Sequence, residues 1–246
     1  MALPTNIVAT PNTSLASELP RTVTITGTDI FERPYSTANE QFTQAAPDVL
    51  AANWIGGATQ VDGVIGKAFD GNNSDSYVNI SSKIPDYKAT NFIGVSFWTV
   101  LDSVDNDCLI SLQKDSDTSN RPLEIHVNSA YNMYLATQAT YGQRRLGNSM
   151  PSTGVPLHIF AWVQFVGSAL TMGFYINGVA ETVLNGANPG AFGTETADGF
   201  RVGGRIHNGN LIQPSDAKIS NLHISNNPLF KNELAKYMNL PTVEVN

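Results

Sequence analysis

Short segments of strand-forming composition follow one another along most of this chain, separated by turns. The segments are rich in Val, Ile, Phe, Tyr and Thr, and clusters of Gly, Asn, Asp and Ser lie between them. Such a succession, with almost no helical periodicity, predicts an all-β fold, an antiparallel β-sandwich of the jelly-roll type. The segments are Arg21–Gly27, Ile93–Leu101, Cys108–Gln113, Leu123–Asn128, Met133–Gln138, Leu157–Val166, Leu170–Gly178, Gly199–Gly204 and Ala217–Ser225.

Two local signals add detail to this fold. The Asn177-Gly178 pair favours a tight primed turn between two strands. Pro228–Met238 is the one segment with helical spacing: Pro228 suits an early helical position, and Phe230 and Leu234 begin an apolar stripe. We therefore expect one short helix near the C-terminal end of the sequence.

The stretch Gly66–Ile80, GKAFDGNNSDSYVNI, raises the question of a metal-binding loop. A helix–loop–helix calcium site needs Gly at its sixth position and Glu at its twelfth. Counted from Asp70, those positions hold Asp75 and Ser81, so the motif fails. Turn-forming Asn and Asp between strand-forming flanks favour a hairpin connection instead. A looser Ca²⁺ site with Asp70 and Asp75 as ligands stays open, and no other cofactor is expected.

Charge and composition exclude several classes of partner. Charged residues make up 14% of the chain, below the roughly 25% of an average soluble protein, and the net charge is −7. The longest basic run is Arg144–Arg145. Phosphate backbones and anionic membranes need clustered positive charge, so we expect neither nucleic acid nor a membrane surface as a partner. No stretch approaches the 18 apolar residues of a transmembrane helix.

The N-terminal region differs in composition from the rest. Residues 1–20 are rich in Pro, Thr, Ser and Asn, without periodic apolar positions, and Pro34 interrupts the segment that follows Arg21–Gly27. No basic residue precedes Arg21, so a signal peptide is not predicted. We expect an extended arm over residues 1–45, ordered by a partner or not at all, and a sandwich domain over residues 46–246.

Residues of catalytic type are present, but in no catalytic spacing. The sequence has no nucleophile elbow, phosphate-binding loop or dinucleotide fingerprint. The single cysteine, Cys108, is expected to be a buried free thiol. The histidines form no close metal-binding pair and are interpreted as packed or hydrogen-bonded residues; they are His126, His158, His207 and His223.

Four segments occur in a recognisable order. Gly63–Ile80 matches a Gly-Lys-rich stretch that leads through Phe-Asp-Gly to a Tyr-Val-x-Ile strand, and Ser96–Trp98 matches a Ser-x-Trp strand. Leu157–Val179 matches a hairpin ending in Tyr-x-Asp-Gly, with Asn177 in place of Asp, and Ala217–Met238 matches a final strand and helix. Over about residues 50–240 the chain therefore resembles a laminin-G-like domain of the concanavalin A-like jelly-roll superfamily. Lectins, adhesion modules, glycanases and structural proteins share this sandwich.

The resemblance also bears on catalysis. Glycanases of this superfamily carry alternating Glu-x-Asp-x-Glu carboxylates on one strand face, as paired acid–base chemistry needs. Here Glu124, Glu181 and Glu195 are isolated. We therefore expect a protein that is not an enzyme, with a degenerate glycan hydrolase as a minor alternative.

Carbohydrate binding needs an aromatic platform and planar polar groups, and several predicted loops carry both. The alternative is that these are solvated loop residues of an Asn-rich protein. Trp98 and Trp162 lie within apolar strands and are expected in the core. The candidate glycan-binding residues are Tyr141, Gln143, Arg144, Arg145, Asn208 and Asn210.

The low charge and the abundance of Thr, Asn and Gly resemble bacteriophage virion proteins. We expect a non-enzymatic structural protein of a phage particle, a head decoration or tail-fibre component, made in the host cytoplasm and located in the virion. Its arm would dock on other virion proteins, and its loops would bind cell-surface glycans. A homotrimer stays open. The alternative is a free carbohydrate-binding or adhesion module, with or without calcium.

Overall fold

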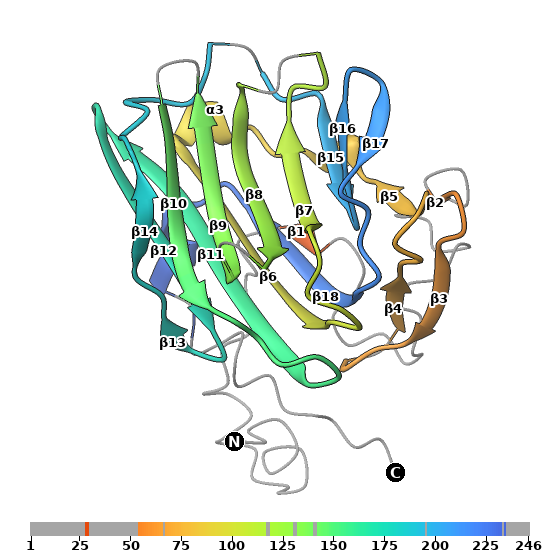
Figure 1. Ribbon diagram of the computed structural model, residues 1–246. Coiled ribbons are helices and arrows are strands. Elements are labelled where there is room, and N and C mark those ends of the chain that lie inside the picture. Colours follow the sequence, from red (N-terminus) through yellow and green to blue (C-terminus); the bar gives the residue numbers. More distant parts are fainter. Residues whose placement is uncertain are drawn as a thin grey trace, which may run out of the picture.

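The computed structural model describes residues 28–29, 54–65, 67–116, 119–129, 132–139, 142–194, 196–232 and 234. Figure 1 shows two layers of antiparallel strands, with sheet B in front and sheet A behind it. The predicted all-β sandwich is confirmed. Within the described residues, no helix has the length and apolar character needed to cross a bilayer.

Sheet A has eight strands, and the last strand of the described residues lies in its interior. Strand β18 pairs with β6 on one side and with β4 and β1 on the other. β4 pairs with Lys218–Ser220 of β18, and β1 pairs with His223 and Ile224 along the same edge. The strands, in spatial order, are β13 (Val179–Ala180), β12 (Ala169–Ile176), β11 (Pro156–Val166), β6 (Phe92–Val100), β18 (Lys218–Ser225), β4 (Lys67–Asp70) and β3 (Thr59–Asp62), with β1 (Thr28–Asp29) beside β18.

Sheet B also has eight strands and stacks on sheet A. A small hairpin, β16 (Arg205–His207) with β17 (Asn210–Ile212), contacts β7 and β15 of this sheet. The strands, in spatial order, are β14 (Val183–Gly186), β10 (Gly142–Ser149), β9 (Asn132–Ala139), β8 (Arg121–Asn128), β7 (Asp107–Gln113), β15 (Gly199–Val202), β5 (Tyr77–Asn79) and β2 (Trp54–Ile55).

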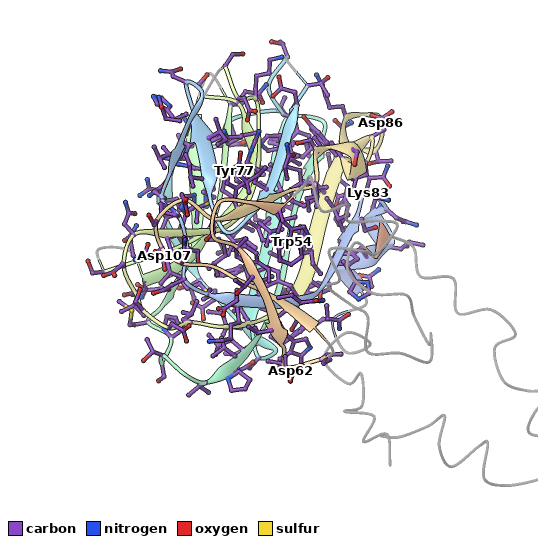
Figure 2. The ribbon with its side chains drawn as sticks, turned by 90° about the vertical axis from the view of Figure 1, so that its right-hand side faces the viewer. Trp54, Asp62, Tyr77, Lys83, Asp86 and Asp107 are labelled. Atoms are coloured by element: carbon purple, nitrogen blue, oxygen red, sulfur yellow. The ribbon has the colours of Figure 1, made fainter. Side chains whose placement is uncertain are left out.

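The hydrophobic core fills the space between the sheets because strand side chains alternate between two faces. On β8, Leu123, Ile125 and Val127 are fully buried in this core. Trp54 belongs to the same core and lies between the two layers in the edge-on view of Figure 2. Burying each large apolar side chain contributes about 1.5–3 kcal/mol. The same alternation turns Glu124 and His126 of β8 away from the core.

Most predicted strands lie within two residues of the observed ones, and the Asn177-Gly178 turn is confirmed, with φ of 49° and 78°. Several strands were missed, and the longest of them is β10 (Gly142–Ser149). Gln143, Arg144 and Arg145 were expected in a loop, but they belong to β10, which pairs with β9 and β14. Their composition favours no strand, so neighbouring strands rather than local propensity determine this element.

The Gly66–Ile80 stretch does form a strand, a turn and a strand, but the predicted hairpin is wrong. β4 belongs to sheet A and β5 to sheet B, so the turn carries the chain from one layer to the other. Asn72 organises it: its side-chain Oδ1 accepts the backbone N–H groups of Ser74, Asp75 and Ser76 at 3.1–3.2 Å.

The C-terminal helix and two tryptophans differ from what the sequence predicts. The C-terminal helix begins at Pro228 as predicted, but the described part is a short 3₁₀ helix, η3 (Pro228–Asn232), and residues 235–246 lie outside the described residues. Trp162 packs with Phe92, Phe160 and Phe230 on the outer side of sheet A, and Trp98 is half-buried beside His158. The two tryptophans are therefore not part of the inter-sheet core, contrary to expectation.

The predicted N-terminal arm falls mostly outside the described residues, as does the strand predicted for Arg21–Gly27. Thr28 and Asp29, within the expected arm, pair with β18. The division of the chain at residue 45 stays a prediction. A four-residue helix that was not predicted, α3 (Tyr87–Thr90), begins after Asp86, whose carboxylate accepts the N–H of Ala89.

Candidate functional site

A polar cavity of about 270 Å³ opens on the outer face of sheet B, the face turned away from sheet A. Figure 1 looks onto this face, with β8, β9 and β10 side by side. Its lining side chains are Asn106, Arg121, Glu124, His126, Asn128, Tyr134, Ala136, Gln143, Arg145, Arg205 and Gln213. A second cavity, of about 210 Å³, lies beside β3 and β18, where Lys218 is already paired with Asp102 at 2.8 Å.

Strand register brings the cavity residues together. Glu124 of β8 lies opposite Ala136 of β9, and Arg145 of β10 lies on the other side of Ala136. His126 of β8 is paired with Tyr134 of β9. Because side chains two residues apart share a face, these strands place a carboxylate, an imidazole, a phenol ring and a guanidinium on one surface.

Glu124 is the buried centre of the cavity. Its Oε2 lies 2.8 Å from Nη1 of Arg121 and 3.1 Å from Nε2 of His126, and its Oε1 lies 3.6 Å from Nη1 of Arg205. Burial acts to raise the pKa of Glu124, but Arg121, His126 and Arg205 outweigh it and lower this pKa to about 2. The carboxylate is therefore ionised at neutral pH and holds these side chains in place.

His126 and Tyr134 form a stacked pair beside this carboxylate. Their ring centroids are 5.2 Å apart with an interplanar angle of 11°. The guanidinium carbon of Arg145 lies 5.2 Å from the centre of the Tyr134 ring, within the range of a cation–π contact. Burial lowers the pKa of His126, with Glu124 opposing this effect, so the imidazole is neutral at pH 7.

The cavity holds more positive than negative charge. Three arginines, Arg121, Arg145 and Arg205, face one carboxylate, which leaves an excess of two positive charges at neutral pH. Several polar atoms of the lining are buried without a hydrogen-bond partner among the described residues. They are Nε of Arg121, Nε of Arg205, Nδ1 of His126 and Oε1 of Gln213.

The residues predicted to bind glycans separate into three groups. Gln143 and Arg145 line the cavity, while Arg144 between them donates to the Gly186 carbonyl on β14 at 3.3 Å. Asn208 and Asn210 lie at the β16–β17 turn, where Asn210 donates to the Asn208 carbonyl at 3.2 Å. Tyr141 lies outside the described residues.

The main residues that sequence reasoning missed are Arg121, Glu124, His126, Tyr134 and Arg205. A signal was present for two of them: Glu124 and His126 are two residues apart in a predicted strand, which places both on one face. Glu124 was expected to stand apart from other carboxylates, but its basic partners were not foreseen: Arg121 and His126 lie on the same strand, and Arg205 comes from β16.

The predicted calcium ligands both have partners within the protein. The Asp75 carboxylate accepts the N–H of Gly57 at 3.1 Å and the side-chain amide of Asn72 at 2.7 Å. An oxygen of Asp70 lies 3.9 Å from Nζ of Lys218. Calcium binding at Asp70 and Asp75 stays a prediction.

A different group has metal-ligand chemistry. Sγ of Cys108 and side-chain ligand atoms of Glu124 and His126 lie within 4.8 Å of one another, and all three side chains are buried. Two features oppose a cation there. Arg121 and Arg205 already neutralise Glu124, and burial raises the pKa of the Cys108 thiol, so it stays protonated. Cys108 is a buried free cysteine, as predicted.

No protein-family model and no curated sequence matches this chain. Several solved structures resemble it. A mutant of NanB sialidase from Streptococcus pneumoniae shares 15% identity with a TM-score of 0.51, over 74% of this chain and 28% of that chain. A mutant of HCR D/C VPI 5995 shares 14% identity with a TM-score of 0.50, over 75% of this chain and 46% of that one.

A third similar structure is domain 4 of AbnA, an extracellular arabinanase from Geobacillus stearothermophilus, solved with arabinotriose. It shares 23% identity with a TM-score of 0.48, over 69% of this chain and 75% of that chain. This chain matches less than half the length of the sialidase chain and of the HCR chain. The likenesses to the sialidase and HCR structures establish a common β-sandwich fold.

Proposed function

We propose that this domain binds carbohydrate, without catalysis, in the cavity on the outer face of sheet B. The observation that carries the proposal is a single cavity lined by planar polar side chains, with guanidinium, amide and imidazole groups from β8, β10 and β16 and the phenol ring of Tyr134 from β9. Planar groups of this kind provide directional donors and acceptors for sugar hydroxyls. Carbohydrate sites need such fixed geometry because each hydroxyl competes with water.

The cavity is organised before any ligand arrives. Glu124 fixes Arg121 through a hydrogen-bonded ion pair at 2.8 Å, and the Tyr134 ring, which is 5% exposed, supports His126 by stacking. Tyr134 therefore braces the polar side chains and offers little open ring surface to a sugar. Side chains that are already immobilised lose less conformational entropy on binding, which improves affinity.

The absence of catalysis is also part of the proposal. Glycosidases that use two carboxyl groups place them on either side of the scissile bond, and one must hold a proton. Among the described residues that line the cavity, Glu124 is the one carboxyl group, and its pKa of about 2 keeps it ionised. This carboxylate serves as a counter-ion to the arginines.

Binding of the purified chain to a glycan array tests the proposed function. We expect specific binding that Arg145→Ala weakens by at least about tenfold, because a charged hydrogen-bonding group is lost. Arg144→Ala is the matched control: it removes an arginine from the same strand but outside the cavity lining. A folded protein that binds no glycan would refute the proposal, as would equal losses in both variants. Repeating the array in EDTA determines whether calcium takes part.

We further propose that this domain is displayed on a bacteriophage particle, with residues 1–45 as the anchor to other virion proteins. The support comes from the sequence: 14% charged residues, abundant Thr, Asn and Gly, and an N-terminal region rich in Pro, Thr, Ser and Asn. The laminin-G-like resemblance agrees with a display module. A free adhesion module with the same cavity is the alternative.

A further inference from the structure

We infer that the cavity selects sugars that carry a carboxylate, a conclusion that rests on the proposed carbohydrate binding and names the ligand class. The first observation is the charge of the lining. The whole chain carries a net charge of −7, yet this cavity has three arginines and one ionised carboxylate. A local positive site on an acidic protein attracts anions at short range and offers neutral sugars no comparable gain.

Unused hydrogen-bond donors point the same way. Nε of Arg121 and Nε of Arg205 are buried with no partner in the described part of the chain. Nδ1 of the neutral His126 is an acceptor, because Nε2 donates to Glu124, and it suits a hydroxyl of the sugar instead. A buried donor without an acceptor is destabilising, so a ligand that brings acceptors to these guanidinium groups is favoured over one that brings donors. A carboxylate is acceptor-only and has two oxygens, while a sugar hydroxyl is both donor and acceptor.

Arg205 is the arginine best placed to meet the ligand. Arg121 is committed to Glu124 at 2.8 Å and also donates to Gln138. Arg205 approaches Glu124 only to 3.6 Å, which exceeds hydrogen-bond distance, so this contact leaves its donors unused. Arg145 is held over the Tyr134 ring, on the β10 side of the cavity. A carboxylate between Arg205 and Arg145 would accept from planar guanidinium groups, the geometry in which arginine binds carboxylates best.

The size of the cavity limits the ligand. Its volume, about 270 Å³, lies just below the roughly 300 Å³ at which pockets for drug-sized molecules begin. This space suits one sugar residue. We therefore expect recognition of a single acidic residue, terminal or in a side branch, with the remainder of the glycan outside the cavity.

Matched sugar pairs test the inference by titration calorimetry with the full chain. Each pair has the same sugar with and without the acid: glucuronate against glucose, and sialyllactose against lactose. Sulfated lactose forms a third arm, because sulfate shares the negative charge but not the planar geometry. We expect at least about tenfold tighter binding of the carboxylated member, and weaker binding of the sulfated one.

Two variants test whether Arg205 causes the preference for the carboxylated sugar. Arg205→Gln keeps a planar amide and removes the charge, and we expect it to abolish the preference for the acidic member. Arg144→Gln, outside the cavity lining, should leave the preference intact. Circular dichroism confirms that both variants are folded. Equal binding of both members of each pair, or a preference that survives Arg205→Gln, overturns the inference but not the proposed function. Binding of no sugar overturns both.

Discussion

Glu124 determines how the outer face of sheet B is arranged, although none of its surface is exposed. A buried carboxylate is stable only with compensating charge, and here Arg121 and Arg205 provide it. Removing one member of such a group leaves the others buried and uncompensated. The positions of the arginines in the cavity therefore depend on a residue that a ligand hardly touches.

Sequence reasoning could identify part of this residue cluster and not the rest. Alternation within β8 is readable from the sequence, so Glu124 and His126 could have been placed on one face. Arg205 lies 81 positions after Glu124 in the sequence, on a separate hairpin. No local pattern encodes that proximity, because it arises from the order of strands and from the position of the β16–β17 hairpin.

Asp107 provides a residue-scale prediction about pH. Burial, with further contributions from Asp216 and Asp105, raises the pKa of Asp107 from 3.8 to about 7. Its Oδ2 is buried without a hydrogen-bond partner among the described residues. A raised pKa means that the folded state binds the proton more tightly. The contribution to stability is therefore complete below about pH 4 and is lost as the pH rises through about 7.

We expect Asp107→Asn to be more stable than the unmodified protein by about 1–3 kcal/mol at pH 8, because it removes a buried charge. The difference in free energy of unfolding between Asp107→Asn and the unmodified protein should grow between pH 4 and pH 7 and then level off. Urea unfolding at a series of pH values measures it. Asp105→Asn is the control: its carboxylate is exposed, so a much smaller change is expected. A constant difference at all pH values would contradict the assignment.

At the scale of elements, the turn between β4 and β5 connects the two sheets. Its shape depends on Asn72, whose one side-chain oxygen satisfies three backbone N–H groups. Asn73 adopts a φ of 52°, a left-handed conformation that Asn tolerates better than most residues. The polar cluster that suggested a metal loop is thus explained by hydrogen bonds within the turn.

We expect Asn72→Ala to lower the free energy of unfolding by about 1–3 kcal/mol, because three N–H groups lose their acceptor. Chemical denaturation measures the loss. Asn73→Gly is the matched control at the next position, and it should have little effect because Gly adopts positive φ readily. An Asn72→Ala variant as stable as the unmodified protein would show that water replaces the lost acceptor.

Elements differ in how far the sequence predicts them. Apolar strands such as β6, β11 and β18 were predicted within two residues, because their composition and alternation are strong local signals. β10 is polar and was missed. The hairpin predicted for Gly66–Ile80 was wrong because turn chemistry does not determine which sheet the next strand joins.

At the scale of the whole molecule, the proposed display on a phage particle makes a prediction about the N-terminal region. We expect the intact chain to be found by mass spectrometry in purified particles. Deletion of residues 1–27 should prevent attachment, while it leaves the β1–β18 pairing in place. A deleted variant that is folded by circular dichroism and still attaches would contradict the anchor role.

The interior position of β18 in sheet A has a consequence for synthesis of the protein. β6 and β4 are translated more than a hundred residues before the strand that separates them, Lys218–Ser225. Until that strand leaves the ribosome, β6 and β4 present unpaired edges, and such edges can associate with other chains. Sheet A therefore closes late, and a nascent or truncated chain that lacks β18 is the species most in need of a chaperone.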